Sequence, residues 1–252
     1  MIQAERIGAI LDLLNQQGSV SVDDLATRLN VSPMTIRRDL DTLDQEGYLT
    51  RCHGGAVLRQ GSTTEVPYSD KSQRNIDEKK RIAERCATLV KPNDTIFLDA
   101  GTTCLEIAKK IIHIPGIRVT TNDLNIALYL THHDIEVYLP GGIIQKSTRS
   151  VLGESVTKAI QQMTFTISFI GTASVSNNWE VMTPTMEKMY LKRMIIERSE
   201  YSYLVADASK FHQQAMYMIE HISKFSGVIT NYEFTESELK TIHEEDIYVI
   251  NV

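Results

Sequence analysis

The feature that most constrains this chain is an alternation of strand-like and helix-like segments that runs from about residue 77 to the end. Apolar runs of strand length occur at Thr95–Asp99, Arg118–Thr121, Glu136–Leu139, Ile167–Ile170, Tyr203–Ala206, Gly227–Thr230 and Ile247–Val252. Helical spacing of apolar residues follows Asp77-Glu78 and recurs at Cys104–Ile112, Leu124–Thr131, Thr185–Arg198 and Glu236–His243. Such alternation is typical of a parallel α/β sheet, of the Rossmann-like kind.

The first 58 residues have a different pattern, which predicts three helices and a hairpin. Apolar residues recur at helical spacing over 5–16, and a second helix begins at Ser21, whose hydroxyl is placed to cap it. A third helix runs from Ser32-Pro33, an N-cap followed by proline at the first helical position, to about Gln45. A hairpin around a glycine turn follows. This order predicts a winged helix-turn-helix.

A polar stretch separates the two patterns. Residues 59–75 contain Gly61, Thr63 and Pro67 and show no apolar periodicity, so they are interpreted as a linker. The expected domains are therefore 1–58, a winged helix-turn-helix, and 76–252, an α/β domain, joined by the linker 59–75. The length of 252 residues agrees with two domains.

The charge balance limits how the first domain can bind DNA. The net charge is −6, and residues 1–60 contain six basic against eight acidic residues, so binding must depend on the placement of charge. In the third helix Ile36, Leu40 and Leu43 share the inner face, which turns the arginines outward. The candidate DNA-binding residues are Ser32, Met34, Thr35, Arg37, Arg38, Thr42, Arg51 and His53. The alternative is a small helical bundle whose arginines are only solvated. Asp39, Asp41 and Asp44 favour this alternative, because they would repel DNA phosphate if they faced it.

A candidate anion site follows the first strand of the second domain. In Asp99-Ala100-Gly101-Thr102-Thr103 a glycine precedes two threonines at the start of a helix, where N–H groups and hydroxyls can bind a phosphate. The polar turns Thr121-Asn122-Asp123 and Pro140-Gly141-Gly142 also follow strands, and ligands of such sheets bind at the carboxyl ends of the strands. Lys192 and Lys210 are the candidate cations. A plain turn with threonine caps and two surface lysines is the alternative interpretation.

Several motifs together resemble the DeoR family of bacterial repressors, and the glycerol-3-phosphate repressor branch in particular. The resemblance rests on Ser32-Pro33-Met34-Thr35-Ile36-Arg37-Arg38-Asp39-Leu40, His53-Gly54-Gly55-Ala56, Asp99-Ala100-Gly101-Thr102-Thr103, Gly153-Glu154, Lys192-Arg193 and Asp207-Ala208-Ser209-Lys210-Phe211. It implies a repressor of a sugar or polyol catabolic operon that a phosphorylated intermediate releases from double-stranded operator DNA. It also implies the effector-binding set Asp99, Gly101, Thr102, Thr103, Asn122, Gly141, Gly142, Lys192, Asp207 and Lys210.

The same resemblance raises a rival function. The second domain resembles the fold of ribose-5-phosphate isomerase and the CoA transferases, so a sugar-phosphate isomerase or deaminase with an added helical domain is the alternative. The isomerases have acids in an Asp-Gly-Ala-Asp turn, where this chain has Gly171-Thr172-Ala173-Ser174. Threonine and serine are too weakly basic to remove a carbon-bound proton unaided, so no catalytic residue and no enzyme activity is expected. A regulator that senses a free sugar is a second alternative.

Cofactors, metals and membranes are not expected. The cysteines Cys52, Cys86 and Cys104 are scattered, and His132-His133 has no third ligand at a suitable spacing. No run of about 18 apolar residues and no signal peptide is present, so a soluble, cytoplasmic protein is expected. Because one small head buries little surface on DNA, we expect a homo-oligomer, a dimer or a tetramer.

Overall fold

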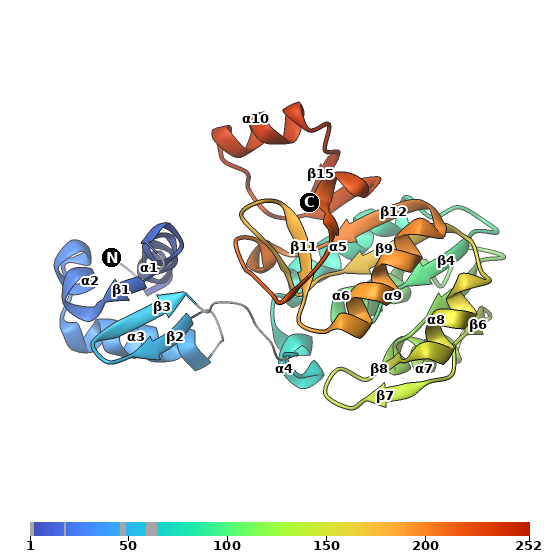
Figure 1. The fold of residues 1–252 in the computed structure, drawn as a ribbon, viewed down its shortest axis with the longest axis horizontal. Helices are drawn as coiled ribbons and strands as arrows, with labels where there is room; N and C mark the ends of the chain where they lie inside the picture. The colour runs from blue at the N-terminus through green and yellow to red at the C-terminus, as the bar shows by residue number, and fades with distance from the viewer. Residues whose placement is uncertain (1–2, 18, 46–48, 59–64) are drawn as a thin grey trace. The chain divides into compact units, whose positions relative to one another are not determined.

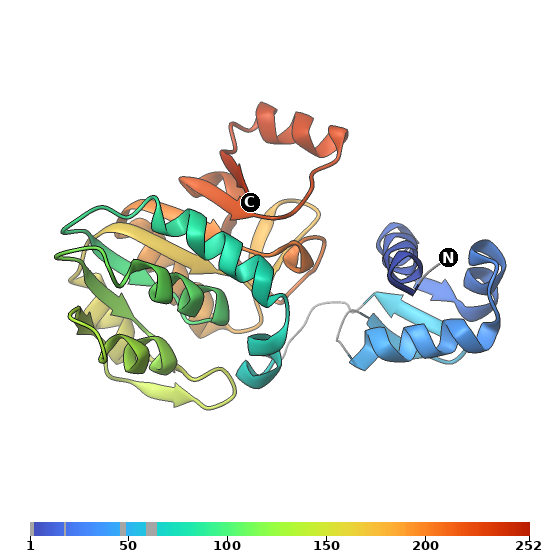
Figure 2. The same cartoon turned by 180° about the vertical axis from the view of Figure 1, so that it is seen from behind.

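The computed structural model describes residues 3–17, 19–45, 49–58 and 65–252. The chain divides into two compact units, Met1–Ser62 and Thr63–Val252. Figure 1 and Figure 2 show the two units from opposite sides.

The first unit is a winged helix. Its elements are α1 (Gln3–Gln17), β1 (Ser19–Ser21), α2 (Val22–Leu29), α3 (Pro33–Gln45), β2 (Leu49–Cys52) and β3 (Gly55–Leu58). The strands form an antiparallel sheet in the order β1-β3-β2, which confirms the predicted hairpin and adds β1, too short to give a pattern in the sequence. A Cβ atom on Gly55 would lie 2.1 Å from the Val20 carbonyl oxygen, so this position needs glycine.

The core of the first unit comes from the apolar face of each helix. Leu14 of α1, Leu25 of α2 and Leu40 of α3 are fully buried together. Arg6 of α1 also lies in this interior, where its Nε donates to Asp39 of α3 over 2.5 Å. A buried ion pair thus joins the first and third helices.

The second unit contains a seven-stranded parallel sheet in the order β15-β14-β12-β9-β4-β5-β6. Its strands are β4 (Thr95–Leu98), β5 (Arg118–Thr121), β6 (Glu136–Tyr138), β9 (Phe165–Gly171), β12 (Ser199–Val205), β14 (Gly227–Thr230) and β15 (Val249–Asn251). All pairs are parallel. The seven predicted strands are therefore confirmed, although β9 and β12 begin earlier than predicted.

Helices cover both faces of this sheet. On the face seen in Figure 2 lie α5 (Ile76–Ala87), α6 (Thr102–Ile111) and α7 (Leu124–Leu130), which contribute Ile82, Ile107 and Ile126 to one apolar core. On the face seen in Figure 1 lie α8 (Glu154–Gln161) and α9 (Met186–Glu197). The helix α10 (Glu236–Glu244) connects β14 to β15.

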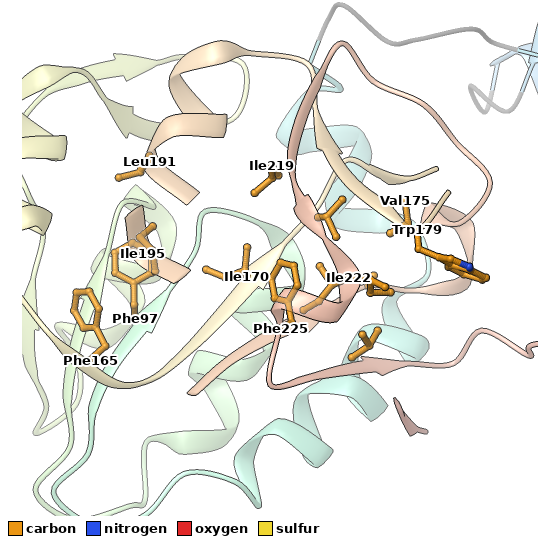
Figure 3. Close-up of a cluster of buried hydrophobic side chains, with 14 of the residues drawn as sticks. Phe97, Phe165, Ile170, Val175, Trp179, Leu191, Ile195, Ile219, Ile222 and Phe225 are labelled. Atoms are coloured by element: carbon orange, nitrogen blue, oxygen red, sulfur yellow. The ribbon is translucent and has the colours of Figure 1, made fainter. Parts of the chain in front are cut away.

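A second apolar core lies on the face of α8 and α9. It includes Phe97, Ile170 and Ile195, and Trp179 is buried in it as well (Figure 3). The core is extended by a small antiparallel sheet in the order β10-β11-β13. These strands, β10 (Ser174–Val175), β11 (Glu180–Thr183) and β13 (Tyr217–His221), did not emerge from the sequence, and neither did α8 or the hairpin of β7 (Ile143–Gln145) and β8 (Ser150–Leu152).

The predicted linker needs a correction over its second half. Residues 59–64 lie outside the described residues, but 65–75 belong to the second unit and contain the helix α4 (Tyr68–Gln73). The Tyr68 backbone N–H donates to the Ser147 carbonyl over 2.8 Å, and the buried Lys79 ammonium donates to the carbonyls of Lys71 and Arg74. These contacts hold a segment whose polar composition resembles that of a free linker.

Across the described residues, the longest apolar helical stretches are too short to cross a membrane.

Candidate functional site

The outer face of α3 presents two arginines to solvent. Arg37 and Arg38 are exposed, and no hydrogen bond or ion pair involves their side chains within the described ranges of the first unit. Met34, one turn earlier on α3, is 69% exposed. A helix of this kind can enter the major groove, where a guanidinium group can donate two hydrogen bonds to a guanine.

The hydroxyl groups near the start of α3 have partners within the helix. The Ser32 Oγ accepts from the Thr35 backbone N–H at 3.2 Å and lies 2.9 Å from the Thr35 Oγ1. The Thr42 Oγ1 donates to the Arg38 carbonyl over 3.0 Å. Each hydroxyl oxygen keeps acceptor capacity beyond these bonds. Ser32 is therefore the N-cap that the sequence predicts.

Arg51 connects the wing to α3. Its Nε donates to the Asp41 carboxylate over 2.8 Å and its Nη1 to the Gly55 carbonyl over 2.5 Å. Asp39 is paired with Arg6. Two of the three acids that favoured a bundle that does not bind DNA, Asp39 and Asp41, therefore have cationic partners within the unit. In this geometry Arg51 positions the wing, a role that the sequence did not indicate, while His53 at the wing turn is exposed.

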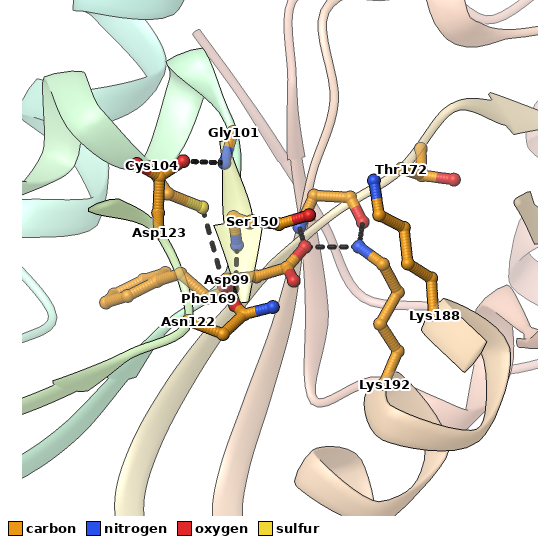
Figure 4. A network of polar contacts seen from close by, with 12 residues as sticks. Asp99, Gly101, Cys104, Asn122, Asp123, Ser150, Phe169, Thr172, Lys188 and Lys192 are labelled. Carbon is orange, nitrogen blue, oxygen red and sulfur yellow. Dashed lines mark hydrogen bonds and ion pairs between the residues drawn. The ribbon is translucent and has the colours of Figure 1, made fainter. Parts of the chain in front are cut away.

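In the second unit, the carboxyl ends of four neighbouring strands, β12, β9, β4 and β5, bring polar residues together. Figure 4 shows those that follow β9, β4 and β5. At the centre Asp99, after β4, forms a buried ion pair with Lys192 of α9. The Asp99 carboxylate accepts from the Gly171 backbone N–H at 3.0 Å, and the Lys192 ammonium donates to the Gly171 carbonyl over 2.7 Å. The pair therefore fixes the end of β9 against the turn after β4.

The turn after β5 is linked to the turn after β4 by two further side chains. The Asn122 Oδ1 accepts from the Ala100 N–H at 3.0 Å, and the Asp123 Oδ2 accepts from the Gly101 N–H at 3.1 Å. Asp123 is also the N-cap of α7. Burial raises the pKa of Asp123 despite its hydrogen bonds. Asn122 and Asp123 thus hold the Asp99–Thr103 loop in place.

The loop ends at the start of α6, where the structure leaves space beside the backbone of Gly101. No neighbouring atom lies within 4 Å of the point where a Cβ on Gly101 would stand. Thr102 is 7% exposed and Thr103 is partly exposed, and α6 has no side-chain cap at this end. The first N–H groups of a helix have no partner within the helix and carry the positive end of its dipole. The arrangement is suited to a phosphate group.

Lys210 lies at the end of β12, in the 3-10 helix η1 (Ala208–Lys210), and is partly buried. Burial lowers the pKa of Lys210, and the nearby Asp207 works against this. Asp207 accepts from the Asn75 amide at 2.8 Å and from the Ser209 N–H at 3.1 Å. Burial would raise the pKa of Asp207, but Lys210 and these hydrogen bonds lower it. In the described part of the chain, the Lys210 ammonium has no hydrogen bond or ion pair.

Gly141 and Gly142 do not join this group through any described contact. A Cβ on Gly142 would lie 2.5 Å from the Leu152 carbonyl and 2.7 Å from a Val156 methyl group. Close packing therefore accounts for this glycine. Gly141 is exposed, and its carbonyl accepts from the Ser155 hydroxyl at 2.7 Å.

The structure adds a cation that sequence reasoning missed, Lys188 of α9. It precedes Lys192 by one helical turn, and the two side chains extend side by side (Figure 4). The Lys188 ammonium donates to the Glu65 carboxylate over 2.8 Å, and Lys71 lies 3.2 Å from the same carboxylate. Burial lowers the pKa of Lys188 to about 8. Its spacing from Lys192, four residues on one helix face, was the available signal.

No cluster of three potential metal ligands of the His, Cys, Asp or Glu type occurs within the described residues. All three cysteines are free thiols, with Cys86 and Cys104 buried and Cys52 exposed.

Comparison with known proteins identifies both units. The DeoR-like helix-turn-helix domain matches residues 6–61, and the DeoR C terminal sensor domain matches residues 74–232. An HTH-type transcriptional regulator of Haemophilus influenzae is 35% identical over 98% of this chain and 96% of its own. The glycerol-3-phosphate regulon repressor of Escherichia coli is 33% identical over 92% of each chain. The lactose phosphotransferase system repressor of Streptococcus mutans is 35% identical over 92% of this chain and 93% of its own.

A weaker likeness concerns the sheet. Ribose 5-phosphate isomerase A from Methanocaldococcus jannaschii has a TM-score of 0.41 and 13% identity, covering 54% of this chain and 55% of that chain. So low a score supports no conclusion about function.

The winged helix and the α/β sensor unit therefore define a DNA-binding transcriptional regulator. The chain belongs to the DeoR family. The resemblance stated from the sequence is thus confirmed.

Proposed function

We propose that this regulator represses a sugar or polyol catabolic operon and leaves its operator when a phosphorylated intermediate binds the second unit. The names of the E. coli and S. mutans relatives, a glycerol-3-phosphate regulon repressor and a lactose phosphotransferase system repressor, support a link to phosphorylated carbohydrates. The observation that carries the proposal is the open start of α6 next to a group of buried cations.

In this proposal the phosphate binds to the N–H groups and hydroxyls of Thr102 and Thr103. Lys210 supplies the positive charge, since it is the lysine of this edge whose ammonium has no hydrogen bond or ion pair in the described residues. Charge-assisted hydrogen bonds of this kind are about twice as strong as neutral ones. Asp99, Asn122 and Lys192 act indirectly, because their mutual contacts fix the loop that presents the threonines.

Release of DNA follows from linkage. The protein is proposed to have one arrangement that binds DNA and one that does not. A ligand that binds the second arrangement more tightly lowers the affinity for the operator by the ratio of its two affinities, typically about 5- to 150-fold. We propose further that the regulator acts as a dimer or a tetramer, because two heads on one operator gain affinity through effective concentration. The exposed Ile143 and Ile144 of β7 offer apolar surface for such contacts, and light scattering measures the oligomeric state.

The test is a binding experiment on the wild-type protein and three variants. Lys210→Ala is expected to retain operator binding and to lose release by sugar phosphates, and Thr102→Ala/Thr103→Ala to behave alike. Lys224→Ala is a matched control, because Lys224 ends the equivalent 3-10 helix η2 (Ile222–Lys224) and is exposed. Calorimetry with phosphorylated sugars and their unphosphorylated forms gives the affinities. Equal binding of both forms would contradict the phosphate pocket and favour a sensor of free sugar.

A further inference from the structure

The segment 65–75 is held to the second unit by contacts to the cations at its ligand edge. Its first described residue, Glu65, has a side chain that is 7% exposed. The Glu65 carboxylate lies 2.8 Å from the Lys188 ammonium and 3.2 Å from that of Lys71. Burial would raise the pKa of Glu65, but Lys71 and Lys188 outweigh it and lower the pKa. The carboxylate is therefore an anion held within a group of lysines.

This group of lysines continues into the proposed phosphate site. Lys188 lies one turn before Lys192, which is paired with Asp99 in the loop that leads to Thr102. Lys71 and Glu65 both lie close enough to act on the charge of Lys210, since Lys71 lowers the pKa of Lys210 and Glu65 raises it. Glu65 thus shares its cationic surroundings with the group that we expect to bind the effector.

From this arrangement we infer that Glu65 acts as an internal substitute for the effector's phosphate. The inference rests on the proposed function. A phosphate group and the Glu65 carboxylate carry charge of the same sign, and both depend on the lysines of this edge, the phosphate on Lys210 and the carboxylate on Lys188 and Lys71. When a phosphate binds, it competes with Glu65 for these lysines and repels the carboxylate. Glu65 then leaves, and the segment 65–75 loses its buried anchor.

The consequence concerns the connection to DNA. Segment 65–75 is the first described part of the second unit, on the side of the chain that leads to the DNA-binding unit. Its attachment has two arrangements, with Glu65 bound or released, and a ligand that prefers the released one shifts the population. This gives the pocket a direct way to change how the first unit is tethered.

The first experiment measures competition. The full-length protein and its Glu65→Gln variant are titrated at pH 7 with inorganic phosphate and with glycerol 3-phosphate by calorimetry. Because the carboxylate no longer competes, the variant is expected to bind both probes of the order of tenfold more tightly. Glu84→Gln is the control, since Glu84 forms an exposed ion pair with Lys110 at the far end of α6 and its loss should leave affinity unchanged.

The second experiment needs no variant. Hydrogen–deuterium exchange of the wild-type chain is followed with and without phosphate, in peptides that cover residues 65–75. We expect faster exchange with phosphate at the Tyr68 amide, which bonds to Ser147, and at the Lys71 amide, which bonds to Pro67. Because exchange follows local opening, it reports release of the segment directly.

The outcomes separate the two proposals. If phosphate binds to the wild type, but Glu65→Gln binds it no more tightly and 65–75 stays equally protected, the role of Glu65 is wrong and the phosphate pocket stands. If neither probe binds to either protein, the pocket is contradicted, and with it the substitute role of Glu65.

Discussion

The two units use positive charge in opposite ways. On the DNA-binding unit, Arg37 and Arg38 are exposed, without partners among its described residues. In the sensor unit, Lys79, Lys188 and Lys192 are buried, and each donates to a carboxylate or a carbonyl. An exposed cation can exchange water for DNA phosphate at little cost. A buried cation has lost its water and needs a partner to offset the cost of burying its charge. The two arginines of α3 therefore face solvent, whereas these three lysines are held in internal contacts that a ligand can rearrange.

The largest effect is expected from breaking an internal pair. Lys192→Met leaves the Asp99 carboxylate buried without its cation, which should lower the free energy of unfolding of the second unit by about 3–5 kcal/mol. Urea denaturation of the full chain measures it. The control is Lys158→Met, which removes an exposed ion pair with Glu154. Its expected change in the free energy of unfolding is below about 1 kcal/mol. Similar losses of stability in both variants would show that the buried pair is worth no more than an exposed one.

The next effect concerns an exposed arginine. Because Arg38 lies on the outer face of α3, Arg38→Ala should weaken operator binding by about 1–3 kcal/mol and relax the base preference at one position per half-site, with no loss of stability. Fluorescence anisotropy with single-base operator variants measures both. Arg28→Ala is the control, since Arg28 is paired with Asp24 on α2. Unchanged affinity and specificity for Arg38→Ala would show that α3 does not enter the groove as proposed.

Arg51 is intermediate between the exposed arginines and the buried lysines, because it is partly buried and paired with Asp41. If it only positions the wing, Arg51→Ala should weaken operator binding by about 1 kcal/mol without changing the salt dependence. If it neutralises a phosphate, the slope of log affinity against log salt should fall by about one. Titrations at several salt concentrations decide between these outcomes.

The smallest effect is a pH dependence of the sensor unit. Burial lowers the pKa of both Lys79 and Lys188 to about 8, below the value of about 10.5 in an unfolded chain. Between these values the unfolded state binds more protons, so the contribution of these lysines to stability should rise with pH from about 8 to 10.5. Phosphate affinity should fall as the pH rises through about 8, because these lysines, which add positive charge around the site, then lose it. Phosphate affinity that is constant from pH 7 to 9.5 would show that these lysines do not contribute.

The sequence predicted those parts of the fold that have a strong local pattern. The seven parallel strands and α3 with its Ser32 cap are as expected, since a buried strand and an amphipathic helix each mark their own residues. The short strands β10, β11 and β13 were missed, because two to five residues with partners far along the chain leave no periodicity. Segment 65–75 was misjudged because polar contacts hold it, and such contacts have no signature in composition.

The candidate site was predictable in its location but less so in its roles. Several polar strand ends indicated the edge of the sheet, and the structure brings Asp99, Asn122 and Lys192 together there. Their internal pairing could not be foreseen, because a sequence does not show which charges neutralise each other. For the same reason Glu65 and Lys188, 123 residues apart in the chain, were not associated.

The most direct test of ligand-controlled release is the anisotropy of a labelled duplex, selected for binding from a random pool, during titration with sugar phosphates. We predict that at least one phosphorylated sugar releases wild-type protein from this duplex, whereas its unphosphorylated form does not. The Lys210→Ala protein should bind the same duplex and stay bound throughout. If sugar phosphates that bind to the protein leave the complex intact, or if the Lys210→Ala protein is released like the wild type, the proposed coupling is contradicted.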